Sequence, residues 1–239
     1  MRKNEQPDKD DAVATASVLP EDSAEPRDTH MPLTPANILF LFLLGGFAGT
    51  LVETVWCLLI EGRFAWRAGL MFVPFNPVYG GGILVLYFTL RSFGRKQKLR
   101  VFLASYVVGT AVEYFFSWLQ EQVLGSVSWD YSGLPLNIGG RVCLFYSLGW
   151  GILGLFWALY VSPMLERLIV RVPVLVKRIL VSVLLSFVVC GMIVSSLAIL
   201  SWRARSLELS TPFFAPLFDR LFPDPVMQWF YPNIWFCVQ

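Results

Sequence analysis

The chain has 239 residues, of which 56% are hydrophobic and 15% charged, and its formal net charge is +2. Soluble domains carry about 25% charged residues, so this composition excludes an ordinary water-soluble globule and favours a membrane protein. The small, dispersed charge argues against nucleic-acid binding. The four scattered cysteines indicate neither a disulfide framework nor a cysteine metal site.

Residues 1–35 are polar and acidic and contain few large apolar side chains. We expect them to form a disordered cytoplasmic N-terminal tail. The segment has no short apolar core followed by a small-residue cleavage site, so the first membrane helix should direct insertion and the tail should be retained.

A spanning helix needs about 20 mostly apolar residues. Five stretches approach that length: residues 36–60, 77–92, 101–123, 142–162 and 179–201. We therefore expect an all-α integral membrane protein with about five transmembrane helices, four of them in a core over residues 36–162. Because the second stretch is short and glycine-rich, counts of four and six stay open.

Arginine and lysine in short loops set the orientation of a membrane protein. The loops after the second and fourth stretches are the most basic, with Arg91, Arg95, Lys96, Lys98 and Arg100 in one and Arg167, Arg171, Lys177 and Arg178 in the other. This pattern predicts an inner-membrane protein with its N-terminus in the cytoplasm and its C-terminus outside. Residues 163–201 should then hold a cytoplasmic amphipathic segment and the fifth helix. Residues 202–239, rich in proline and aromatics, should lie at the outer interface, although Arg203 and Arg205 oppose that orientation.

An internal repeat links the first and third stretches. Gly49-Thr50-Leu51-Val52-Glu53 recurs 60 residues later as Gly109-Thr110-Ala111-Val112-Glu113, and Gly45 and Ser105 precede the two copies by four residues. Positions i, i+4 and i+8 share one helical face, so each glutamate ends a stripe of small residues that suits close helix packing. Asn76 before Gly80 and Asn137 before Gly139 extend the match. We expect two parallel helix-loop-helix repeats.

The two glutamates allow a structural and a functional interpretation. A charged carboxylate at the bilayer centre costs roughly 2.5 to 3.5 kcal/mol, so it persists where it pairs or lines a polar path. Arg67 and Arg141 are the candidate partners. If Glu53 and Glu113 met across the pseudo-symmetry axis, their repulsion would favour a shared proton or a bound cation. Alternatively, both are structural and hydrogen-bonded across helices.

The two outer loops are rich in residues that suit a binding site. The first has irregular backbone, with two prolines and three glycines over residues 74–82, and such backbone survives at membrane depth when it is buried or lines a wet cavity. The second would be a lid or binding loop, or simply an interfacial belt and turn. The candidate substrate- or ion-path residues are Glu53, Glu113, Arg67, Asn76, Tyr79, Trp129, Asp130, Tyr131, Asn137 and Arg141, and the candidate helix-packing residues are Gly45, Gly49, Ser105 and Gly109.

Several short motifs occur in order between Gly45 and Gly154. They are Glu53, Pro74-x-x-Pro77-x-Tyr79-Gly80, Glu113-Tyr114, Trp129-Asp130-Tyr131, Asn137-x-Gly139, Arg141-x-Cys143-Leu144 and Trp150-Gly151. In this set the chain resembles the ABC-transporter type IV (CmpB-like) family of integral membrane proteins. It departs from the family pattern at Arg67-Ala68-Gly69 and at Val73, which puts the role of Arg67 in question. The resemblance implies a permease subunit served by a separate ATPase.

The leading functional hypothesis is therefore a permease-like subunit of a transport system. The chain contains no Gly-x-x-x-x-Gly-Lys-Ser/Thr phosphate loop, so ATP would be bound by a partner. The alternatives are a non-catalytic scaffold or sensor, and a membrane enzyme using carboxylate acid-base chemistry. The single histidine, His30, lies in the tail, which excludes histidine-ligated zinc and Ser-His catalysis within the membrane core. A carboxylate-only metal or acid-base site stays open, and we name no catalytic residue, metal or cofactor. The expected partners are the bilayer, an ATPase subunit and a second copy of the chain.

Overall fold

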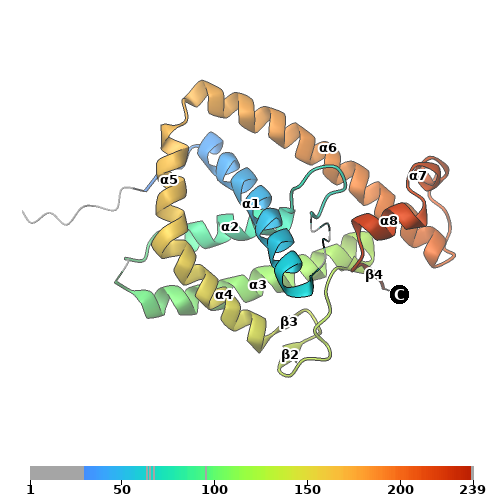
Figure 1. Cartoon of the computed structure of the whole chain (residues 1–239), viewed down its shortest axis with the longest axis horizontal. Coiled ribbons are helices and arrows are strands. Elements are labelled where there is room, and N and C mark those ends of the chain that lie inside the picture. The colour runs from blue at the N-terminus through green and yellow to red at the C-terminus, as the bar shows by residue number, and fades with distance from the viewer. Residues whose placement is uncertain (1–29, 63, 65, 67, 95, 238–239) are drawn as a thin grey trace, which may run out of the picture.

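The computed structural model describes residues 30–62, 64, 66, 68–94 and 96–237 (Figure 1). The tail expected over residues 1–35 lies largely outside this range, and so does Arg67. Two antiparallel strand pairs join β1 (Ser126–Val127) to β4 (Trp235–Phe236) and β2 (Asn137–Ile138) to β3 (Val142–Cys143). The helices are α1 (Pro35–Glu61), α2 (Pro77–Leu90), α3 (Lys98–Leu124), α4 (Leu144–Phe156), the π-helix η1 (Trp157–Val161), α5 (Ser162–Arg171), α6 (Val174–Ser206), α7 (Ala215–Leu221) and α8 (Asp224–Phe230).

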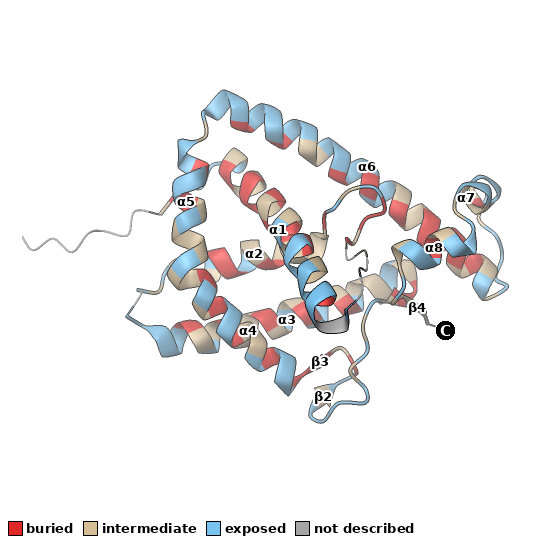
Figure 2. Ribbon diagram, viewed as in Figure 1, coloured by how far each residue is buried: buried red, intermediate tan, exposed pale blue. Residues whose placement is uncertain are grey.

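Four helices in the described part of the chain are long and apolar enough to cross a membrane: α1, α3, the continuous helix α4-η1-α5, and α6. Much of their outward surface is exposed in the isolated chain, as expected for lipid-facing helices (Figure 2). The prediction of a mainly helical, multi-pass membrane protein is confirmed, with four candidate spans in the described residues. The second expected span, α2, has only 14 residues, which cover about 21 Å and fall short of a hydrocarbon core of roughly 30 Å.

Helix boundaries follow local sequence signals. Thr34 and Asn76 cap α1 and α2 through side-chain oxygens, and each is followed by a proline at the first helical position, where a missing N–H costs nothing. Pro173 separates α5 from α6 because it ends helical geometry in the preceding residue. The amphipathic segment expected after residue 163 is therefore divided between α5, the last part of the continuous α4-η1-α5 helix, and the start of α6.

The connection between α1 and α2 returns along α1 before α2 begins. The Asn76 N–H donates to the Gly46 carbonyl at 3.3 Å, and the fully buried Phe75 ring packs against Gly46, near the middle of α1. On the other side, the Met71 N–H donates to Ser195 Oγ of α6 at 3.0 Å. This irregular backbone is thus enclosed between α1 and α6.

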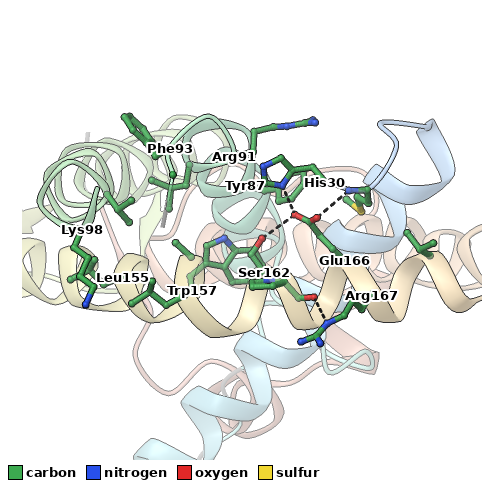
Figure 3. Close-up of a pocket in the computed structure, with 18 of the residues that line it drawn as sticks. His30, Tyr87, Arg91, Phe93, Lys98, Leu155, Trp157, Ser162, Glu166 and Arg167 are labelled. Carbon is green, nitrogen blue, oxygen red and sulfur yellow. Dashed lines mark hydrogen bonds and ion pairs between the residues drawn. The ribbon is translucent and has the colours of Figure 1, made fainter. Parts of the chain in front are cut away.

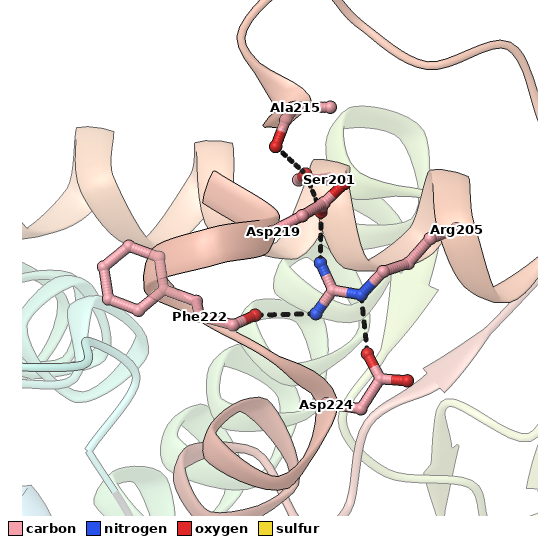
Figure 4. Close-up of polar contacts among 6 residues, drawn as sticks. All are labelled: Ser201, Arg205, Ala215, Asp219, Phe222 and Asp224. Atoms are coloured by element: carbon pink, nitrogen blue, oxygen red, sulfur yellow. Dashed lines mark hydrogen bonds and ion pairs between the residues drawn. The ribbon is translucent and has the colours of Figure 1, made fainter. Parts of the chain in front are cut away.

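Arg205, at the C-terminal end of α6, organises the chain that follows (Figure 4). Its guanidinium binds Asp219 and Asp224, and Nη2 donates to the Phe222 carbonyl at 2.7 Å. Arg203 donates to the Cys237 carbonyl at 3.3 Å. Because both arginines bind within the chain, their departure from the expected charge distribution has a structural explanation.

Candidate membrane-embedded glutamate sites

Glu113 lies on the buried face of α3. This face is an i, i+4 series of Val101, Ser105, Gly109, Glu113 and Ser117. Glu113 is 8% exposed, and both of its carboxylate oxygens accept hydrogen bonds at 2.9 Å, Oε1 from Tyr131 Oη and Oε2 from Trp150 Nε1. One donor comes from the loop after α3 and the other from α4, so the carboxylate joins three segments.

Tyr131 is suited to remain a donor. Burial, followed by the neighbouring Glu113 carboxylate, raises the pKa of Tyr131 well above its ordinary value, so the phenol keeps its proton. Its ring also stacks on Tyr146, with centroids 4.7 Å apart. The loop that carries Tyr131 is thereby anchored to α3 and to α4.

Glu53 is half-buried on α1 and has a corresponding aromatic partner on the next helix. Tyr79 Oη donates to Glu53 Oε2 at 2.5 Å. As in the α3–α4 pair, a glutamate of the first helix accepts a hydrogen bond from an aromatic donor on the second. Each carboxylate is held within its own helix pair, so these contacts do not join Glu53 to Glu113.

The two helix pairs also pack through matching contacts. A Cβ atom added at Gly49 would overlap Tyr79, and one added at Gly109 would overlap Trp150. The remaining matched contacts are Phe42 on Gly80 with Phe102 on Gly151, and Gly45 on Ile83 with Ser105 on Gly154. In every case the α1 and α3 members differ by 60 in residue number and the α2 and α4 members by 71.

The small-residue stripes are thus occupied within the chain. Gly45 and Gly49 lie against α2, and Ser105 and Gly109 against α4. Neither stripe is free to pack on a second copy or on another membrane protein. These two faces therefore give no support to the expected homodimer.

Arg141 does not contact Glu113, which was one expectation for it. Its guanidinium forms an ion pair with Glu121, donates to Ser117 Oγ at 3.2 Å, and lies 5.7 Å from the centre of the Tyr114 ring. Hydrogen bonding to Glu121 raises the pKa of Arg141. Trp129 Nε1 donates to the Arg141 carbonyl at 2.9 Å, so both residues fasten the loop after α3 to the end of that helix.

The remaining polar candidates shape their own loops. Asn76 caps α2, whereas Asn137 lies in the β2–β3 hairpin and bonds to the Leu134 carbonyl at 2.8 Å and to the Gly140 N–H at 3.0 Å. Asp130 accepts from Ser132, which lowers the pKa of its carboxyl. Asn137 and Gly139 therefore lie in a hairpin, whereas Asn76 and Gly80 lie at the start of a helix, so these two pairs of residues do not correspond in structure.

Sequence reasoning did not single out Trp150 or Glu121 as site residues. A signal for Trp150 existed, because Trp150-Gly151 and Tyr79-Gly80 are both an aromatic donor followed by the glycine that packs on a phenylalanine. Glu121 follows Glu113 by eight residues, as Glu61 follows Glu53. Among the described residues, no group of three or more His, Cys, Asp or Glu side chains is arranged to hold a metal ion.

Long apolar helices packed as helical hairpins, with carboxylates inside the helix pairs, define a multi-pass membrane protein. The model of the family described as "Putative ABC-transporter type IV" matches residues 40–196, and the chain belongs to this family. The match extends beyond the motifs into α6, further than the resemblance over Gly45–Gly154 suggested. Comparisons with curated proteins and with solved structures give no match.

Proposed function

We propose that this protein is the permease-like membrane subunit of a transport system, and that Glu53 and Glu113 line its polar path. The observation that carries the proposal is Glu113, which is 8% exposed near the middle of a spanning helix and hydrogen-bonded on both carboxylate oxygens. A carboxylate at this depth is expensive, and its usual roles are cation or proton binding along a path. The aromatic donors keep it oriented in either protonation state.

The matched contacts support an origin of the two helix pairs by duplication. In this interpretation α1–α2 corresponds to α3–α4, with Tyr79 equivalent to Trp150 and Gly80 to Gly151. The returning connection would enter the membrane beside α1, and α2 would complete the crossing to the cytoplasmic side, so a helix too short to cross alone still brings the chain back across. Membrane transporters commonly place their sites near such interrupted segments at the interface of repeats.

The family supports a separate ATPase as the partner, because this chain has no phosphate loop of its own. The basic loops at residues 91–100 and 167–178 would face the cytoplasm and the ATPase. Such an arrangement fits a chain whose N-terminus is inside and whose C-terminus is outside.

Purification from the native membrane tests this proposal. We would isolate the tagged wild type, the double variant Glu53→Gln/Glu113→Gln, and the control Glu208→Gln, whose side chain is exposed outside the helices. We expect all three to retain an ATPase in a fixed ratio by mass spectrometry. In nanodiscs, ATP turnover by the double-variant complex should fall at least about tenfold, because glutamine keeps the hydrogen bonds but carries no charge with which to bind a proton or cation on the path.

Two results would contradict the proposal. If no ATPase accompanies any of the three proteins, an ATP-driven role is wrong. If the ATPase is recovered but the double variant turns over at the wild-type rate, the glutamates are structural and the transport path lies elsewhere.

A further inference from the structure

A cavity of about 750 Å³ lies between the N-terminal end of α1, the α2–α3 connection and the α4-η1-α5 helix (Figure 3). It is separate from the glutamate contacts described above. Its volume is within the range of small-molecule sites in proteins. The π-helix η1 lines it, and single π-turns inside α-helices occur frequently at functional sites.

Several residues that line this cavity carry a buried polar atom without a hydrogen-bond partner. Among the described residues, four buried side-chain nitrogen or oxygen atoms have no partner, and three belong to lining residues: Trp157 Nε1, Arg91 Nη1 and Tyr87 Oη. Trp157 is 6% exposed and Tyr87 is 2% exposed. The Glu166 carboxylate lies close enough to the Tyr87 hydroxyl to interact with it electrostatically.

The chemistry of these atoms specifies the ligand. An indole N–H and a guanidinium N–H can only donate, so whatever satisfies them must present acceptor oxygens. Leaving a buried donor unsatisfied is costly, and native proteins rarely do so without a ligand, an ion or water at the site. The ligand expected here is therefore rich in acceptors.

The charge of the lining selects an anion. Four lining residues are basic, namely Arg91, Lys98, Arg167 and Arg171, and none is ion-paired with an acidic side chain in the described part of the chain. The single acidic residue of the lining, Glu166, is already engaged by the Met31 N–H at 3.0 Å, His30 Nδ1 at 3.0 Å and Ser162 Oγ at 3.3 Å. The Glu166 carboxylate is thus already hydrogen-bonded within the chain and does not neutralise the basic side chains of the lining.

We propose that this cavity binds a phosphate-bearing anion, held by Arg91, Trp157 and Tyr87. Phosphate offers several acceptor oxygens and a charge that guanidinium and ammonium groups recognise. The same chemistry is available from an anionic phospholipid headgroup and from soluble phosphate. The apolar part of the wall, which includes Leu90, Val101 and Leu155, would accommodate the beginning of an acyl chain.

The test uses the full chain, delipidated in neutral detergent. Binding of phosphatidylglycerol is compared with that of phosphatidylcholine by native mass spectrometry, and inorganic phosphate is titrated in a thermal-shift assay against chloride of equal ionic strength. The cavity variant is Arg91→Gln/Trp157→Phe. The matched control, Arg220→Gln/Trp56→Phe, changes the same residue types at exposed positions away from the cavity.

We expect phosphatidylglycerol or inorganic phosphate to bind the wild type, and the dissociation constant to rise about tenfold or more in the cavity variant only. Binding of the lipid alone assigns the site to the membrane, and binding of phosphate alone assigns it to a soluble ligand. If neither binds, or if cavity variant and control weaken binding equally, the proposal is wrong. Should the cavity variant not fold, Lys98→Gln at the exposed rim must still weaken binding, and an unchanged affinity would overturn the proposal.

Discussion

Glu113 is the point at which two donors from different parts of the chain converge. Tyr131 belongs to the loop after α3 and Trp150 to α4, yet both reach one carboxylate at 2.9 Å. The number of donors, rather than the charge alone, determines what a substitution at this position costs. A glutamine can accept from Trp150 with its oxygen while its amide donates to the Tyr131 hydroxyl, which can also accept. A leucine can do neither.

We therefore predict that Glu113→Leu lowers stability more than Glu113→Gln. Leucine leaves two buried donors unpaired at a cost of about 1 to 3 kcal/mol each, whereas glutamine keeps both bonds. Thermal unfolding midpoints in detergent provide the comparison. In a Tyr131→Phe/Trp150→Phe background the leucine penalty should shrink, because no donor remains to be satisfied. Equal midpoints for the Leu and Gln variants in the wild-type background would contradict the prediction.

At the scale of elements, close approach defines each helix pair. Gly109 packs directly on the Cβ and Cγ atoms of Trp150, which cannot move without moving α4. Gly149, which precedes Trp150 on α4, has open space where a Cβ would be. The two glycines thus offer the same chemical change in opposite environments.

Gly109→Ala should lower the unfolding midpoint, whereas Gly149→Ala should leave it unchanged or raise it. At Gly149 the alanine gains up to about 1 kcal/mol of helix propensity. At Gly109 that gain is outweighed because the methyl group forces α3 and α4 apart and disturbs the Trp150 bond to Glu113. Parallel denaturation of the two variants measures the difference, and a stabilised Gly109→Ala protein would show that the helices are not in close contact.

The elements also show what the sequence could predict. Apolar length located α1, α3 and α6, and the i, i+4 spacing of Ser105, Gly109 and Glu113 agrees with the buried face of α3. Periodicity carries no information on contacts between distant segments. It therefore missed the Trp150 bond to Glu113, the ion pair of Arg141 with Glu121, and the return of the α1–α2 connection to Gly46. The functional roles of these residues stay predictions.

In the whole molecule, the C-terminal segment connects the ends of both helix pairs. Tyr231 Oη donates to the Gly69 carbonyl at 3.4 Å, and Trp229 stacks on Trp66 at 6.2 Å, so α8 and the chain after it cover the first loop. Strand β4 pairs with β1 beside the second loop. A segment expected to lie at the interface thus packs, in part, on the loop that leads into α2 and on the loop that carries Tyr131.

Met227 of α8 is the most direct place to test how the C-terminal segment packs on the rest of the protein. It is fully buried in a cluster with Met71, Ala198, Ile199 and Trp202, whereas Phe213, fourteen residues earlier, is 97% exposed. Met227→Ala should destabilise by about 2 to 5 kcal/mol through lost burial and the cavity left behind. Phe213→Ala should leave the unfolding midpoint unchanged.

Limited proteolysis distinguishes local release from general destabilisation. If the C-terminal segment holds the first loop in place, Met227→Ala should speed cleavage within residues 68–76 at temperatures well below unfolding, because local opening precedes global unfolding where contacts are lost. Cleavage in the β2–β3 hairpin, which lies outside the Met227 cluster, serves as the internal reference. A uniform increase at both sites would mean that the segment adds stability to the whole protein without controlling the loop that leads into α2.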